Sequence, residues 1–118
     1  MSSFRDLKVW QKAHAFSLRV AKCADRIAPR NPRLARQLTE AADSVPACLA
    51  EGRGRATDND FARFVTMAIG SINEVENHLQ RAYDGGLIPL AEYESLTADA
   101  VEIRKMLVGL RKALNKNS

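Results

Sequence analysis

Apolar side chains recur every three or four residues along most of the chain, and this spacing predicts α-helices. The clearest stripe lies in the last third of the chain and consists of Tyr93, Leu96, Ala100, Ile103, Leu107, Leu110 and Leu114. Alternating steps of three and four make a heptad seam, which packs against neighbouring helices at a shallow crossing angle. An alternating apolar and polar pattern of useful length, which would indicate a β-strand, does not occur in the sequence.

Three earlier segments carry stripes of the same kind. The first consists of Trp10, Ala13, Ser17, Val20, Ala24 and Ile27. The second consists of Leu34, Leu38, Ala41 or Ala42, Val45 and Leu49. The third consists of Phe61, Phe64, Val65, Ala68, Ile72, Val75, Leu79 and Ala82. Together with the last third, these stripes predict helices with one buried face each.

Prolines and glycines separate the four segments. Residues 29–32 read Pro-Arg-Asn-Pro, residues 52–55 read Gly-Arg-Gly-Arg, and Gly85 is followed by Gly86. These residue types end helices and form tight turns. Four helices joined by short loops predict an all-α fold, an antiparallel up-down-up-down four-helix bundle that takes up residues 1–118 as a single domain.

Two residues inside the predicted helices call for a structural reason. Pro46 lacks a backbone N–H, so we expect a kink in the second helix at this point. Gly70 lies in the middle of the third helix, where glycine costs about 1 kcal/mol relative to alanine. We expect another helix to approach closely at Gly70, and a tolerated weak point is the alternative.

The composition is that of a globular protein, with 46% hydrophobic and 27% charged residues. No run approaches the roughly 20 apolar residues that a membrane span needs, and the N-terminus has no apolar signal core. We therefore expect a cytoplasmic protein that does not contact membranes. Cys23 and Cys48 lie far apart inside predicted helices, which favours two buried, reduced thiols over a disulfide.

The net charge of +4 is unevenly distributed. Residues 1–55 carry eleven Lys/Arg against five Asp/Glu, and residues 56–103 carry two against nine. Residues 104–118 add five basic residues and no acidic ones. Such an arrangement can bind polyanions through the basic part, or it can pair one subunit with another, basic against acidic.

Catalytic and metal-binding patterns are absent from the sequence. His14 and His78 are not part of the repeated Glu-x-x-His pairs that a metal site in a helical bundle usually needs. Glu74 and Glu76 point to different sides of their helix, so they are not an acid–base pair. No nucleophile is accompanied by a base. We therefore expect neither an enzyme nor a bound metal or cofactor.

The basic residues are the remaining functional candidates. Arg33 and Arg36 follow the first inter-helix loop, and Arg53 and Arg55 lie at the second. In an antiparallel bundle these two loops lie at opposite ends. We predict that Arg33, Arg36, Arg53 and Arg55 bind nucleic acid through its phosphates, without reading its sequence. The alternative is a charged face that is solvated or that pairs subunits.

Three motifs carry a family resemblance. Residues 4–13 read Phe-Arg-Asp-Leu-Lys-Val-Trp-Gln-Lys-Ala, and residues 44–55 read Ser-Val-Pro-Ala-Cys-Leu-Ala-Glu-Gly-Arg-Gly-Arg. The third motif consists of Phe61, Phe64, Ala68, Gly70, Ser71, Glu74 and Glu76. In this order and over nearly the whole chain, the sequence resembles the 23S rRNA intervening-sequence proteins.

The resemblance implies a four-helix bundle that assembles into a homopentamer. A distantly similar protein, the accessory variability determinant of diversity-generating retroelements, works beside a reverse transcriptase and binds nucleic acid through a basic surface. By this analogy we expect a non-enzymatic, self-assembling accessory protein whose partners are RNA or DNA and a protein such as a reverse transcriptase. The alternative is a protein–protein interaction scaffold that does not bind nucleic acid.

Overall fold

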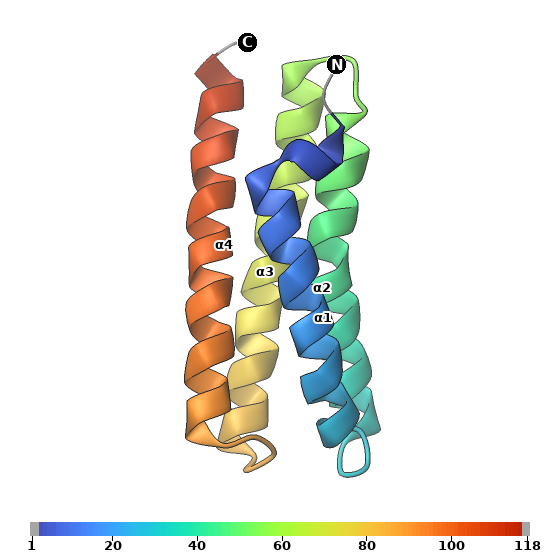
Figure 1. Ribbon diagram of the computed structural model, residues 1–118, viewed down its shortest axis with the longest axis vertical. Coiled ribbons are helices and arrows are strands. Elements are labelled where there is room, and N and C mark those ends of the chain that lie inside the picture. The colour runs from blue at the N-terminus through green and yellow to red at the C-terminus, as the bar shows by residue number, and fades with distance from the viewer. Residues whose placement is uncertain (1–2, 117–118) are drawn as a thin grey trace.

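Long α-helices lie side by side in residues 3–116, the part of the chain that the computed structural model describes (Figure 1). This part measures 46 × 19 × 19 Å. It consists of a short 3₁₀-helix η1 (Phe4–Asp6) and four α-helices, α1 (Lys8–Ile27), α2 (Pro32–Arg53), α3 (Asp58–Asp84) and α4 (Leu90–Lys116). The predicted all-α four-helix bundle is confirmed, whereas η1 was not predicted.

Successive helices run in opposite directions (Figure 1). The α1–α2 and α3–α4 loops therefore share one end of the bundle, which we call the loop end. At this end Arg30 Nη1 donates to the carbonyl oxygen of Gly86 over 3.2 Å and so joins the two loops. The α2–α3 loop lies at the opposite end, the terminal end, together with η1 and the end of α4.

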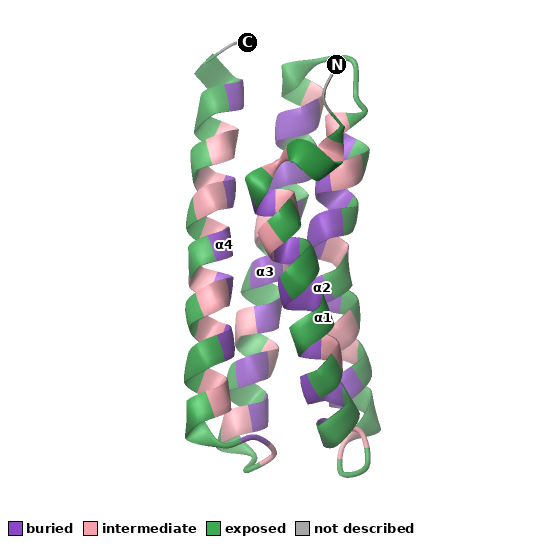
Figure 2. Ribbon diagram, in the orientation of Figure 1, coloured by how far each residue is buried: buried purple, intermediate pink, exposed green. Residues whose placement is uncertain are grey.

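The predicted stripes form the core. Buried positions lie on the inward faces of the helices, and exposed positions cover the outside (Figure 2). Val20, Leu38, Val65 and Ile103 have no exposed surface, and each comes from a different helix. Phe16 is also buried although the predicted stripe of the first helix omitted it. No helix of residues 3–116 is long and apolar enough to span a bilayer.

The helix ends follow from local side-chain chemistry. The Asn31 side-chain oxygen accepts from the backbone N–H of Leu34 over 3.0 Å and caps α2. The Thr57 hydroxyl accepts from the N–H of Asp60 over 3.1 Å and caps α3 in the same way. After α3, Gly86 adopts φ 72°, a left-handed conformation that favours glycine.

The prediction for Gly70 is wrong. Gly70 is exposed, and a Cβ atom added there would meet no atom within 4 Å. The close approach occurs instead at Gly52, near the end of α2, where an added Cβ would lie 2.7 Å from the Cβ of Phe64. Gly70 is therefore the tolerated weak point that was the alternative. The α2 helix continues through the buried Pro46 to Arg53.

Candidate nucleic-acid interface

The basic residues of α1 that face α4 are neutralised by the acidic residues of α4. The contacts are Lys12 Nζ with Asp99 Oδ1 at 3.9 Å and Glu102 Oε2 at 3.3 Å, Arg19 with Asp99, and Arg26 with Glu92. Arg19 also donates to the hydroxyl of Ser95 over 2.9 Å. The opposite charges of the two parts of the sequence therefore pair within one chain along a seam between α1 and α4. Consequently Lys12, Arg19 and Arg26 are poor candidates for binding a polyanion.

Arg33 and Arg36 differ from these residues because they remain unpaired. Both are exposed in the first turns of α2, and neither side chain forms a hydrogen bond or ion pair with any residue of 3–116. They are three residues apart and line two different grooves. Arg33 lines a groove between α2 and α3, whereas Arg36 lines a groove beside Ala24 and Ala28 at the end of α1.

Arg53 and Arg55 lie at the terminal end, away from Arg33 and Arg36 (Figure 1). Arg55 Nη2 lies 3.7 Å from Glu51 Oε1, and the Arg55 guanidinium lies 4.7 Å from the centre of the Phe64 ring. Arg53 is half-buried. The structure thus divides the four predicted residues into two groups, as the loop order predicted, and it does not bring the groups together in one chain.

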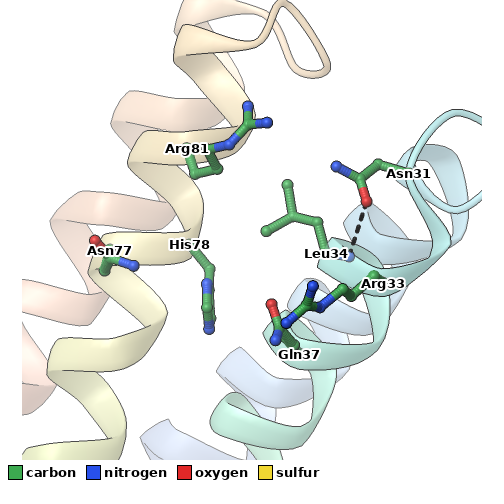
Figure 3. A pocket seen from close by; sticks show the side chains of 7 residues that line it. All are labelled: Asn31, Arg33, Leu34, Gln37, Asn77, His78 and Arg81. Atoms are coloured by element: carbon green, nitrogen blue, oxygen red, sulfur yellow. Dashed lines mark hydrogen bonds between the residues drawn. The ribbon is translucent and has the colours of Figure 1, made fainter.

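The groove between α2 and α3 has a volume of about 350 Å³ and lies toward the loop end (Figure 3). Arg33 and Gln37 line it from α2, and Asn77, His78 and Arg81 line it from α3. The apolar side chain of Leu34 points across from α2 toward α3. None of the described residues that line this groove is acidic. Its polar groups are two guanidinium groups, three amides and the imidazole of His78, which suits an anionic ligand with hydroxyl groups.

The His78 ring projects into this groove between the two helices (Figure 3). Its Nε2 lies 3.3 Å from Glu74 Oε2, one turn earlier on α3, and only 13% of its side chain is exposed. The ring is therefore held by a carboxylate that does not itself line the groove. Residues 3–116 contain no group of three or more His, Cys, Asp or Glu that could hold a metal ion.

Sequence reasoning missed Arg81 because this arginine lies in the acidic part of the chain, 48 residues after Arg33. Periodicity places Arg81 on the third helix, but it does not identify which residues of the second helix lie near it. The available signal was the antiparallel pairing itself, because the start of the second helix must lie beside the end of the third. The Arg81 side chain is exposed and forms no hydrogen bond or ion pair with another residue of the described part of the chain.

Both cysteines are free and buried, as predicted. Burial raises the pKa of the Cys23 thiol, and the nearby Arg26 opposes this shift only partly. A buried thiol with a raised pKa is a poor nucleophile, because the thiolate is the reactive form. Cys23 therefore belongs to the core and not to a reactive site.

Comparison with known proteins places this bundle in a family. The model of the 23S rRNA-intervening sequence protein family matches residues 5–109. The chain is also similar to the crystal structure of a protein of unknown function from the S23 ribosomal protein family of Bacteroides thetaiotaomicron. The two have a TM-score of 0.84 and 24% sequence identity over 88% of this chain and 98% of that one, which shows a shared fold. No curated protein matches the sequence significantly.

The family match covers all four helices, since it begins in η1 and ends within α4. It includes the Trp10 motif, the Gly-Arg-Gly-Arg corner and the Phe61 and Phe64 motif on which the resemblance rests. The chain therefore belongs to the 23S rRNA-intervening sequence protein family.

Proposed function

We propose that this protein is a non-enzymatic, self-assembling accessory protein of the cytoplasm that binds RNA or DNA through a basic surface. The observation that carries the proposal is the contrast between α1 and α2. Three cations of α1 are paired with carboxylates of α4, whereas the side chains of Arg33 and Arg36 on α2 have no partner among the described residues. Phosphate binding needs cations that are not already neutralised, because affinity comes from displacing the counterions of the nucleic acid.

Self-assembly would multiply these contacts. In the homopentamer that the family resemblance implies, each arginine recurs five times, and Arg33, Arg36, Arg53 and Arg55 form two basic rims. Rims of this kind hold a phosphate backbone without reading bases. A protein partner such as a reverse transcriptase would then receive nucleic acid that is already bound to the assembly.

A protein–protein interaction scaffold is the second candidate. The exposed apolar side chains favour it, because Leu18, Met67 and Leu90 expose 56%, 48% and 51% of their surface. They lie on α1, α3 and α4, so contacts with other proteins could form on several sides of the bundle. Under this alternative the arginines contribute to association and not to nucleic-acid affinity.

The test is salt-dependent binding of a mixed-sequence single-stranded RNA, measured by fluorescence anisotropy at 50 and 200 mM salt. Four phosphate contacts predict that the Kd rises about 50-fold between these salt concentrations. Exchanging Arg33 and Arg36 together for glutamine removes two contacts, so the rise falls to about sevenfold.

The matched control exchanges Lys22 and Lys105 for glutamine. Both lysines are exposed and unpaired within residues 3–116, and the control removes the same charge from α1 and α4. We expect it to retain the wild-type salt dependence. An absence of RNA binding at both salt concentrations would reject nucleic-acid binding and leave the scaffold as the better candidate.

A further inference from the structure

Arg33 and Arg81 approach one groove from two helices, and neither is neutralised within the described residues. Elsewhere in the bundle, Arg111 of α4 donates to the hydroxyl of Thr66 on α3 over 3.4 Å. Three other arginines that lie between helices have carboxylate partners. These are Arg19 with Asp99, Arg26 with Glu92, and Arg104 Nε with Glu76 Oε2 at 3.0 Å. The α2–α3 groove is thus a place where two helices bring positive charges together without a lining carboxylate.

The start of α2 adds to this positive potential. The N-terminus of a 22-residue helix carries a partial positive charge, although Pro32 has no backbone N–H and the N–H of Leu34 is occupied by the Asn31 side chain. The Asn31 side-chain oxygen is occupied by the N–H of Leu34, so its amide nitrogen is the group left to bind an acceptor. Arg33, Arg81 and this helix end therefore line one groove, in which the Arg33 guanidinium lies beside Gln37 and that of Arg81 extends toward the loop end (Figure 3).

The remaining lining groups indicate what is attached to the anion. Gln37 and Asn77 carry amides, which both donate and accept hydrogen bonds and suit the hydroxyl groups of a sugar. Leu34 also lines the groove, although only 5% of its surface is exposed. A volume of about 350 Å³ is near the lower end of the range for small-ligand sites, so the groove accommodates a compact ligand and not a duplex.

We infer that the α2–α3 groove binds the phosphate group of a sugar phosphate, with Arg33 and Arg81 as its two cationic ligands and Asn31, Gln37 and Asn77 beside the sugar. The phosphate comes either from the backbone of a single-stranded nucleic acid or from a free nucleotide. The inference deepens the proposed function and rests on it for the nucleic-acid source. It adds Arg81 to the predicted residues and gives Arg33 a role different from that of Arg36.

The two histidines provide a site-specific measurement. His78 lines the groove, whereas His14 is exposed on α1 and stacks on Trp10 with ring centres 4.8 Å apart. We would record the imidazole NMR signals of the full-length protein while adding ribose 5-phosphate, adenosine 5′-monophosphate or a mixed-sequence single-stranded RNA. The expected result is a saturable shift of the His78 signals and none of the His14 signals.

Variants test the assigned ligands. Arg81→Gln should weaken binding of the effective probe about tenfold, the factor expected when a hydrogen-bonded charged contact is lost. Lys105→Gln removes an equal charge from an exposed position on α4 and should change the Kd less than twofold. Thermal unfolding followed by circular dichroism verifies that both variants are folded.

The outcomes separate the groove from the proposed function. A His78 shift with ribose 5-phosphate identifies a free sugar phosphate as sufficient, and a shift with RNA alone identifies the polymer backbone as the source. RNA binding with unmoved His78 signals and equal effects of Arg81→Gln and Lys105→Gln overturns the groove and leaves the proposed function standing. A His78 shift with a small phosphate but no RNA binding rejects the proposed function and retains the groove. No binding of any probe overturns both.

Discussion

Gly52 lies where the end of α2 packs against the start of α3. An added Cβ would lie 2.7 Å from the Cβ of Phe64 and 2.9 Å from Cδ1 of Phe61, closer than such atoms pack in proteins. Both phenylalanines are buried, so they cannot move aside without disturbing the core. Packing therefore requires glycine at position 52. Gly52 does not adopt the left-handed conformation that glycine alone tolerates easily.

We predict that Gly52→Ala destabilises the protein by about 1–3 kcal/mol, the usual cost of overpacking a core. Urea unfolding followed by circular dichroism measures this change. Gly70→Ala is the matched control, because the added Cβ meets no atom within 4 Å and alanine favours the helix. The control should stabilise the protein by about 0.5–1 kcal/mol. Equal stability of Gly52→Ala and the wild type would contradict the packing argument.

The α1–α4 seam shows how an element is held by charge. Asp99 on α4 contacts both Lys12 and Arg19 on α1, and Glu92 contacts Arg26 nearer the loop end. Their side chains are between 24% and 58% exposed, so solvent screens these pairs. The helices themselves were predictable from the sequence. The pairing of α1 cations with α4 carboxylates was not, because the same charge distribution also allows pairing between two subunits.

We predict that Asp99→Asn lowers the free energy of unfolding by about 0.5–1 kcal/mol at low salt, since it weakens two partly exposed ion pairs. The difference from the wild type should shrink in 1 M salt, where screening acts over about 3 Å. Asp43→Asn on α2 is the control, because Asp43 is exposed and has no ion pair within residues 3–116. A loss that persists unchanged in 1 M salt would show that Asp99 acts by packing or hydrogen bonding instead.

At the scale of the whole molecule, the chain leaves apolar side chains in solvent on three helices. Leu18, Met67 and Leu90 are each about half-exposed. Singly exposed apolar residues are common on protein surfaces, so they do not by themselves define an interface. Assembly into the proposed homopentamer would remove some of them from water.

We predict that light scattering of the purified protein gives a mass of five chains, about 65 kDa for a chain of 13.1 kDa. The mass should persist at high salt, because the charged seam lies within the chain and leaves apolar contacts to hold the subunits. Leu18→Glu tests one apolar position and should lower the mass if α1 lies at the interface, whereas Leu18→Met keeps an apolar side chain there and should leave the mass unchanged. A monomer mass at micromolar concentration would reject self-assembly.

The sequence by itself determined the four α-helices, the breaks between them and most of their buried faces, but not η1 or the burial of Phe16. Val20, Leu38 and Ile103 follow the period of a helix, whereas the Asn31 side chain caps the start of α2 and Gly86 turns the chain after α3. Such signals depend on neighbours within a few residues, so they can be interpreted without a structure. The two groups of predicted arginines also followed from the order of the loops.

Only the tertiary structure decided which charged residues remain unpaired and which glycine is packed. Arg19 and Arg33 are both arginines on a helix surface, yet only Arg19 meets a carboxylate of another helix. Gly52 and Gly70 likewise differ only in what the neighbouring helix places beside them. Ion pairing and steric exclusion act over a few ångströms between residues that are far apart in the chain. The periodicity of one helix does not tell which residues of another helix lie within that distance.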